Sequence, residues 1–206
     1  MPKPCLIISG GQFSPFSVPE GGAFVIACDR GYDYARRCGI TPDLVVSDFD
    51  SSQTAVEAGV PVRRLPTEKD DTDTMSALRF ALEHGFREIH LVCALGGRLD
   101  HTLANLQTAA DCALRGERLW LCDALNRCTV LAPGAYAFDR MPGRYLSLFA
   151  CSERVAGLTL TGTLWSLLDA DLTSRYPLGV SNEWTDDTAA LSFREGLLTL
   201  VFSRDM

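Results

Sequence analysis

The feature of this sequence that most constrains its fold is a change of hydrophobic pattern near residue 125. Before it, apolar runs such as FVIAC, DLVVS and IHLVCAL alternate with helical patterns, in one of which Met75, Leu78 and Leu82 repeat at helical spacing. This alternation predicts an α/β domain over residues 1–125, with a mainly parallel sheet covered by helices on both faces. After it the helical period disappears and short runs follow one another across Gly and Pro. That pattern predicts an all-β sandwich over residues 126–206.

Composition limits the classes of partner. With 206 residues and 47% hydrophobic content, the chain can bury a sizeable core. The net charge of −7 and the pI near 4.9 disfavour a nucleic-acid-binding or anionic-membrane surface. No segment approaches the roughly 18 apolar residues of a membrane helix, and we find no signal-peptide core. We therefore expect a cytoplasmic protein that binds neither nucleic acid nor membrane.

The eight cysteines form no C-x-x-C pair, and four of them, Cys5, Cys28, Cys93 and Cys122, lie in or beside apolar runs. We therefore predict buried thiols and neither a disulfide framework nor a structural zinc site.

Acidic residues follow several predicted strands of the first half. Asp29 follows FVIAC, Asp48 and Asp50 follow LVVS, and Asp100 comes just after IHLVCALGGRL. The carboxyl ends of parallel strands meet at one edge of a sheet, where ligands of such sheets bind. Asp73 opens a predicted helix in the segment EKDDTDT. We refer to these five carboxylates as the acidic rim.

Each of these residues also has an ordinary structural explanation. Thr72 or Asp73 could cap a helix, and Asp29 could begin a turn. Together, however, several carboxylates in one crevice would repel one another unless a divalent cation lay among them. Because all the candidate ligands are hard oxygens, Mg²⁺ or Mn²⁺ is favoured over zinc.

The same edge also carries groups suited to phosphate. The GGR sequence at 96–98 supplies backbone N–H groups and a guanidinium, SGG at 9–11 follows the first strand, and Lys69 adds a positive charge. Neither a P-loop nor a dinucleotide-binding fingerprint is present. The residues alone thus predict a magnesium-dependent enzyme that acts on a phosphorylated substrate, with a nucleotide favoured.

Five motifs of the chain resemble those of the thiamine pyrophosphokinase family, in order and at plausible spacing. They are CDRG, PDLVVSDFDS, KDDTDTMSAL, LGGRLDHTLANL and GVSNEW. The resemblance covers most of the chain and implies a homodimer of chains with an α/β domain and a β-sandwich. It also implies transfer of the diphosphoryl group of ATP to the hydroxyl of thiamine, giving thiamine diphosphate and AMP.

The resemblance implies a role for each matching residue. The positions implied to bind the metal are Asp29, Asp48, Asp50 and Asp73. Those implied to contact ATP, its phosphates or the reacting groups are Asp29, Lys69, Asp73, Arg98, Asp100, His101 and Asn105. Those implied to bind thiamine are Ser181, Asn182 and Trp184. The family usually has A-D-G-G, G-D-x-D-S and K-D-x-T-D, so Arg30, Ser47 and Asp71 are departures that leave the metal ligands intact.

Phosphoryl-type transfer needs alignment and charge neutralisation more than covalent chemistry from the protein. Arg98 would stabilise the phosphate oxygens, and Asp100 or Asp73 would accept the hydroxyl proton. His101 is an alternative base, although a histidine at the start of a helix more often has a capping or supporting role.

The β-rich half adds three expectations. Trp120 and Trp165 alternate with apolar neighbours, which predicts that both pack in a core. Trp184 lies in a polar context, and the resemblance implies that it stacks on thiamine and is supplied by the partner subunit. The stretch SFREGLLTLVF predicts a hairpin across Glu195 and Gly196.

Two other functions stay open at this point. A diphosphokinase acting on another alcohol, such as a hydroxymethylpterin, would keep the acidic rim but would not need the SNEW segment. A non-catalytic thiamine or nucleotide sensor would have no reason to keep so much uncompensated negative charge.

Overall fold

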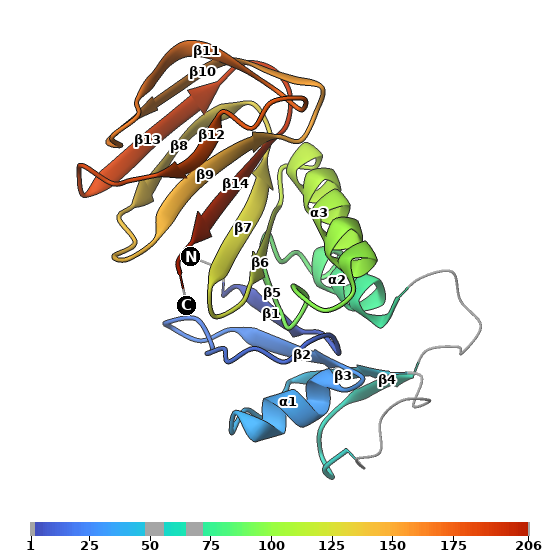
Figure 1. Cartoon of the computed structure of the whole chain (residues 1–206). Helices are drawn as coiled ribbons and strands as arrows, with labels where there is room; N and C mark the ends of the chain where they lie inside the picture. Colours follow the sequence, from blue (N-terminus) through green and yellow to red (C-terminus); the bar gives the residue numbers. More distant parts are fainter. Residues whose placement is uncertain (1–2, 48–55, 65–71, 206) are drawn as a thin grey trace. The chain divides into compact units, whose positions relative to one another are not determined.

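The computed structural model describes residues 3–47, 56–64 and 72–205 (Figure 1). The chain divides into two compact units. The first comprises Met1–Asn105 and Leu119–Ala124, and the second comprises Leu106–Arg118 and Leu125–Met206.

The first unit is built on a parallel sheet. Its elements are β1 (Cys5–Ile8), β2 (Phe24–Cys28), α1 (Gly31–Arg37), β3 (Leu44–Ser47), β4 (Val62–Arg64), α2 (Asp73–Glu83), β5 (Glu88–Val92), the first half of α3 (Leu99–Leu114) and β6 (Arg118–Cys122). The strand order is β6-β5-β1-β2-β3-β4, and β1 to β5 are paired in parallel. The alternation of strands with helices predicted for this half of the chain and the parallel pairing are confirmed.

Helices α1 and α2 cover opposite faces of this sheet, because successive strand residues point to opposite sides. One face buries Leu6, Ile8 and Val25 against Ala35 of α1. On the other face, the Cys28 thiol reaches α2. Figure 1 shows α1 on one side of β2 and β3 and α2 on the other.

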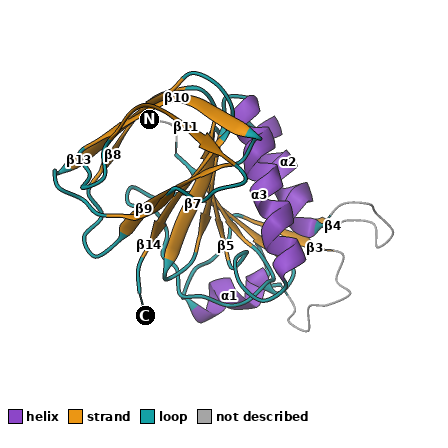
Figure 2. Ribbon diagram, turned by 45° about the horizontal axis from the view of Figure 1, so that its top comes forward, coloured by secondary structure: helices purple, strands orange, loops and turns teal. Residues whose placement is uncertain are grey.

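The second unit contains two antiparallel sheets in addition to the rest of α3 (Figure 2). Its strands are β7 (Asn126–Leu131), β8 (Gly134–Asp139), β9 (Tyr145–Ala150), β10 (Arg154–Thr161), β11 (Leu167–Thr173), β12 (Gly179–Asn182), β13 (Thr188–Phe193) and β14 (Leu198–Ser203). One sheet has the order β12-β9-β14-β7 and the other β11-β10-β13-β8. Phe138 of β8 and Phe202 of β14 meet at 5.6 Å between ring centroids, so the two sheets face each other.

The predicted hairpin at Glu195 and Gly196 is wrong. Strand β13 pairs with β8 and β10, whereas β14 pairs with β7 and β9 in the other sheet. Gly196 has a φ of +91°, and a Cβ there would lie 2.1 Å from the Arg154 carbonyl oxygen. This turn therefore carries the chain from one sheet to the other.

Three further findings concern the core, the cysteines and the helices. Trp120 is 3% exposed, which confirms its predicted core position. Burial raises the pKa of the Cys5 thiol to about 12 and that of Cys112 to about 11, so both stay protonated at neutral pH. No helix in the described ranges is both long enough and apolar enough to span a membrane.

Candidate active site

Asp29 is held at the carboxyl end of β2 by two neighbouring groups. Its backbone N–H donates to the Val46 carbonyl at 3.2 Å, and its carboxylate accepts a hydrogen bond from the Ser47 hydroxyl at 2.7 Å. Ser47 is 1% exposed, so this bond is sheltered from water. The serine that departs from the usual family motif therefore orients an acidic-rim residue.

Asp73 begins α2 next to the same strand end. Thr72 caps the helix by accepting a hydrogen bond from the Met75 N–H at 3.2 Å. The Cys28 thiol donates to the Asp73 carbonyl at 3.7 Å, and Cys28 directly precedes Asp29. Two of the predicted metal ligands thus lie at adjoining ends of β2 and α2, and the helix cap does not use the Asp73 carboxylate.

The loop before α3 adopts the backbone conformations that its glycines allow. Gly96 and Gly97 have φ values of +78° and +66°, in the left-handed region that favours glycine. Asn105 donates from Nδ2 to the Ala94 carbonyl at 2.9 Å and so ties α3 to the end of β5. We infer a positioning role for Asn105, which sequence reasoning had assigned to ATP binding. His101 is exposed, and its backbone N–H donates to the Asp100 carboxylate.

Arg98 and Asp100 form a bidentate ion pair in which Nε and Nη2 of Arg98 donate to the two carboxylate oxygens at 3.1 and 2.5 Å. The hydrogen bonds from Arg98 hold the pKa of the Asp100 carboxyl below its ordinary value. A lowered pKa makes Asp100 a weaker proton acceptor. Which of the two predicted bases, Asp73 or Asp100, accepts the proton stays a prediction.

Replacing Arg98 by Lys should lower kcat by at least about tenfold, on the order of 1.4 kcal/mol of transition-state stabilisation. Lysine keeps the charge but loses the planar fork that can bind two oxygens at once. The matched control is Arg115→Lys, at the other end of α3, where the exposed arginine pairs with Asp111. Steady-state kinetics of both variants would measure this, and equal kcat values would place Arg98 outside the phosphate site.

Asp48, Asp50 and Lys69 lie outside the described residues, as does Asp71, so their roles stay predictions. Within the described ranges, no three His, Cys, Asp or Glu side chains are grouped as a metal site.

The SNEW segment is organised by Asn182, which is 6% exposed. Its Oδ1 accepts from the backbone N–H groups of Trp165 and Glu183, and its Nδ2 donates to the Thr163 hydroxyl and the Trp165 carbonyl. These four bonds use the full capacity of the amide. We infer a positioning role for Asn182, while its contact with thiamine stays a prediction; its neighbour Ser181 presents an exposed side chain.

Replacing Asn182 by Ala should destabilise the fold by about 2 to 3 kcal/mol, because it leaves buried groups near Thr163 and Trp165 without partners. Ser181→Ala, at the neighbouring exposed position, should change the free energy of unfolding by less than about 0.5 kcal/mol. Urea denaturation would compare the two variants. Similar values for both would show that the Asn182 bonds do not stabilise the segment.

Trp184 is more enclosed than its polar sequence context suggests. Its indole stacks on Phe202 at 5.9 Å between centroids, and Nε1 donates to the Arg144 carbonyl at 2.9 Å. Phe202 thus occupies one face of the indole, and at most the other face can receive a ligand.

The prediction that Trp165 packs in a core is wrong, because this residue is 56% exposed. Asn182 binds both its backbone N–H and its carbonyl, so an exposed aromatic side chain is held beside the SNEW segment. Alternation with apolar neighbours is typical of a buried side chain, and at this position it gives the wrong prediction. The chain has no local signal that distinguishes an exposed tryptophan at this position from a buried one.

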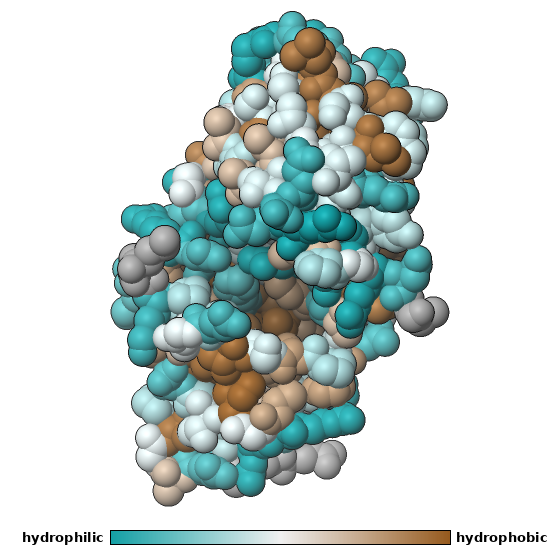
Figure 3. Space-filling model, turned by 90° about the vertical axis from the view of Figure 1, so that its left-hand side faces the viewer, coloured by the Kyte–Doolittle hydropathy of each residue, from teal (hydrophilic) through white to brown (hydrophobic). Residues whose placement is uncertain are grey.

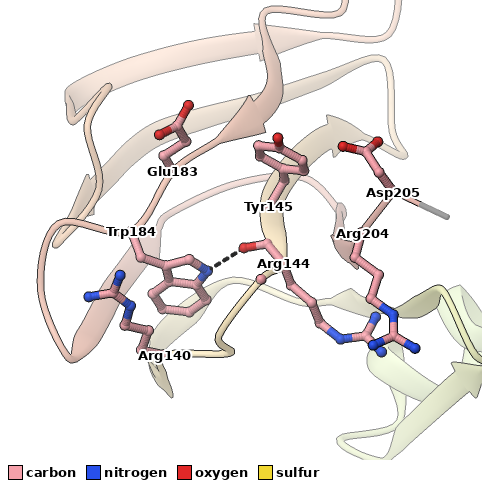
Figure 4. A pocket seen from close by; sticks show the side chains of 8 residues that line it. Arg140, Arg144, Tyr145, Glu183, Trp184, Arg204 and Asp205 are labelled. Carbon is pink, nitrogen blue, oxygen red and sulfur yellow. Dashed lines mark hydrogen bonds between the residues drawn. The ribbon is translucent and has the colours of Figure 1, made fainter.

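A cavity of about 380 Å³ lies beside Trp184 in the second unit (Figure 4). Its wall includes three arginines and two acidic residues: Arg140, Arg144, Arg204, Glu183 and Asp205. None of the three arginines was identified from the sequence.

Comparison with known proteins bears on both units. Residues 19–121 match the family described as "Thiamin pyrophosphokinase, catalytic domain", and residues 136–198 match "Thiamin pyrophosphokinase, vitamin B1 binding domain". The chain is 32% identical over 186 residues to a thiamine pyrophosphokinase of Bacillus subtilis, covering 87% of each protein.

Solved structures of two such proteins are also similar to the chain over nearly its whole length. The Bacillus subtilis structure has a TM-score of 0.89 at 29% identity, covering 99% of this chain and all of that one. The Geobacillus thermodenitrificans structure has a TM-score of 0.85 at 32% identity, covering 98% and 97%. Motifs and fold agree with these similarities, and the chain belongs to the thiamin pyrophosphokinase family.

Proposed function

We propose that the protein transfers the diphosphoryl group of ATP to the hydroxyl of thiamine, giving thiamine diphosphate and AMP. The observation that carries this proposal is an acidic edge with Asp29 and Asp73 in adjoining positions, in a chain that matches both family domains in order. The match to a vitamin B1 binding domain favours thiamine over a pterin alcohol. The retained carboxylates favour an enzyme over a sensor.

The two halves of the chain have different tasks in this proposal. Residues 1–125 form the α/β domain that binds ATP and the metal ion. Residues 126–206 form the β-sandwich that binds thiamine and mediates dimerisation. The separate family matches to residues 19–121 and 136–198 support this division.

Asp29 and Asp73 would hold Mg²⁺ or Mn²⁺ together with Asp48 and Asp50. The described pair offers hard carboxylate oxygens, one of them already oriented by Ser47, and this donor type fits either ion. When bound, the ion would neutralise charge on the phosphate oxygens.

The reaction needs one proton transfer and one displacement. The thiamine hydroxyl oxygen bonds to the β-phosphorus of ATP, the bond from this phosphorus to the α–β bridging oxygen breaks, and AMP leaves. Asp73 accepts the hydroxyl proton, whereas Asp100 holds the Arg98 fork in place. Arg98 and Lys69 stabilise the charge on the transferred group.

Thiamine would stack on aromatic side chains of the second unit. The face of Trp184 opposite Phe202 and the exposed ring of Trp165 are the candidates, and Asn182 fixes the position of the second. A flat cationic ligand gains both stacking and cation–π attraction there, roughly 1 to 2 kcal/mol per desolvated contact.

Exposed apolar residues on two edge strands support a homodimer. They lie on or beside β11 and β12 and are Leu164, Trp165, Leu168, Tyr176, Leu178 and Val180, with exposures from 47% to 85%. Apolar side chains also reach the surface in the upper part of Figure 3, over the four-stranded sheet. Natural edges are seldom left apolar and uncovered, so we place a second copy of the chain against this surface.

AMP release from ATP, measured with and without thiamine, tests the activity. Thiamine-dependent AMP formation would support the proposal. AMP formation that requires a hydroxymethylpterin would identify the other diphosphokinase, and ligand binding without turnover would identify a sensor.

A further inference from the structure

The cavity beside Trp184 concentrates positive charge in a chain whose net charge is −7. Arg140 comes directly after β8, Arg144 directly before β9, and Arg204 directly after β14. Arginines at three strand ends therefore line the same cavity.

Backbone hydrogen bonds hold these arginines in place. The Arg144 side chain donates from Nη1 to the Leu125 carbonyl at 2.6 Å, and the Arg204 backbone N–H donates to the same oxygen at 3.1 Å. The Arg140 backbone N–H donates to the Asp187 carbonyl at 2.8 Å. The Arg144 guanidinium and the backbone positions of Arg140 and Arg204 are thus fixed by the protein itself.

Glu183 and Asp205 also line the cavity but do not neutralise it. Among the described residues, the Arg140 and Arg204 side chains have no ion pair with either carboxylate. Figure 4 shows the guanidinium groups of Arg144 and Arg204 in one part of the cavity and the two carboxylates at the opposite edge of the view. Three cations against two anions leave a net positive charge among the charged groups of the wall, which favours an anionic ligand.

We propose that Arg140, Arg144 and Arg204 form a binding site for a phosphate-class anion, with the diphosphate group as its preferred ligand. Guanidinium forks bind the paired oxygens of such groups through short charge-assisted hydrogen bonds. The ligand is either free diphosphate or the diphosphate end of an organic ester. The proposal of an anion site does not rest on the proposed function. Identifying the organic ester as the reaction product does rest on it.

Trp184 provides a local probe of this site, because its Nε1–H donates to the Arg144 carbonyl. The full-length chain, labelled with ¹⁵N at its tryptophan indoles, would be titrated with sodium diphosphate in EDTA and without Mg²⁺. We expect a saturable shift of the Trp184 indole N–H signal, which Trp184→Phe assigns. The buried Trp120 in the first unit serves as the internal reference.

The Arg140→Gln/Arg204→Gln double variant should weaken diphosphate binding at least about tenfold. Arg175→Gln, at an exposed site elsewhere in the second unit, should leave it unchanged. If the double variant loses its fold, as judged by urea denaturation, Arg204→Gln alone should still weaken binding at least about threefold. No Trp184 shift, an equal shift from sodium chloride at matched ionic strength, or undiminished binding by the Arg→Gln variants would overturn the proposal.

A second arm uses thiamine diphosphate in the same titration. Binding at least about tenfold tighter than free diphosphate would identify the product as the ligand, and equal binding would identify the free anion; both results support the site. Catalytic activity is measured separately, so failure of the site and failure of the proposed function stay distinguishable.

Discussion

Replacing Asp73 by Asn should lower kcat by at least about 10³-fold, because the change removes the residue proposed both to hold the metal ion and to accept the proton. The fold should be retained, since the Thr72 side chain caps the helix and the hydrogen bond from the Cys28 thiol goes to the Asp73 backbone carbonyl, which asparagine keeps. Steady-state AMP release and urea denaturation would measure the two effects. Asparagine cannot accept the proton at neutral pH, so added Mg²⁺ should not restore activity.

The matched control is Glu83→Gln at the last residue of the same helix, which also removes one carboxylate. This variant should keep wild-type kcat. An Asp73→Asn variant with kcat within about tenfold of wild type at saturating Mg²⁺ would exclude Asp73 from both roles, because either loss alone should exceed that factor.

Mixing two inactive variants should restore activity if the site is shared between subunits. Asp73→Asn damages the acidic rim, and Trp184→Ala removes the thiamine-side indole. In a heterodimer of the two, one composite site carries both changes and the other carries neither. Random reassociation makes half of the dimers mixed, so activity should return to about a quarter of the wild-type value.

This comparison requires each variant to be folded, and Trp184→Ala also removes packing on Phe202. Trp184→Leu retains more apolar contact and should give the same complementation. Subunit exchange is verified with differently tagged chains. Demonstrated heterodimers that show no more activity than the parent variants would mean that each chain builds its site alone.

Hydrophobic periodicity was sufficient to predict the parallel sheet and its helices, because strands buried on both faces leave continuous apolar runs. Strand β4 was missed since all three of its residues, Val62 to Arg64, are exposed. The wrong hairpin has a similar cause. A Gly196 turn between two apolar runs is compatible with pairing of those runs or with a change of sheet, and only tertiary packing decides between them.

The candidate site was predictable where chemistry follows from position at strand ends. Asp29 and Asp73 do lie where the carboxyl end of β2 adjoins the start of α2. Contacts between residues far apart in sequence were not predictable, among them the Ser47 bond to Asp29 and the four bonds of Asn182. Nor does spacing alone reveal that Arg98 pairs with Asp100.

Asp29 has a φ of +46°, in the left-handed region where a non-glycine residue costs about 1 kcal/mol. The chain thus holds a carboxylate where glycine would fit the backbone more easily. Selection for heat resistance alone would have reason to replace Asp29 by glycine and would discard the proposed metal ligand with it. Directed evolution of this protein toward higher thermal tolerance should therefore screen for turnover in every round.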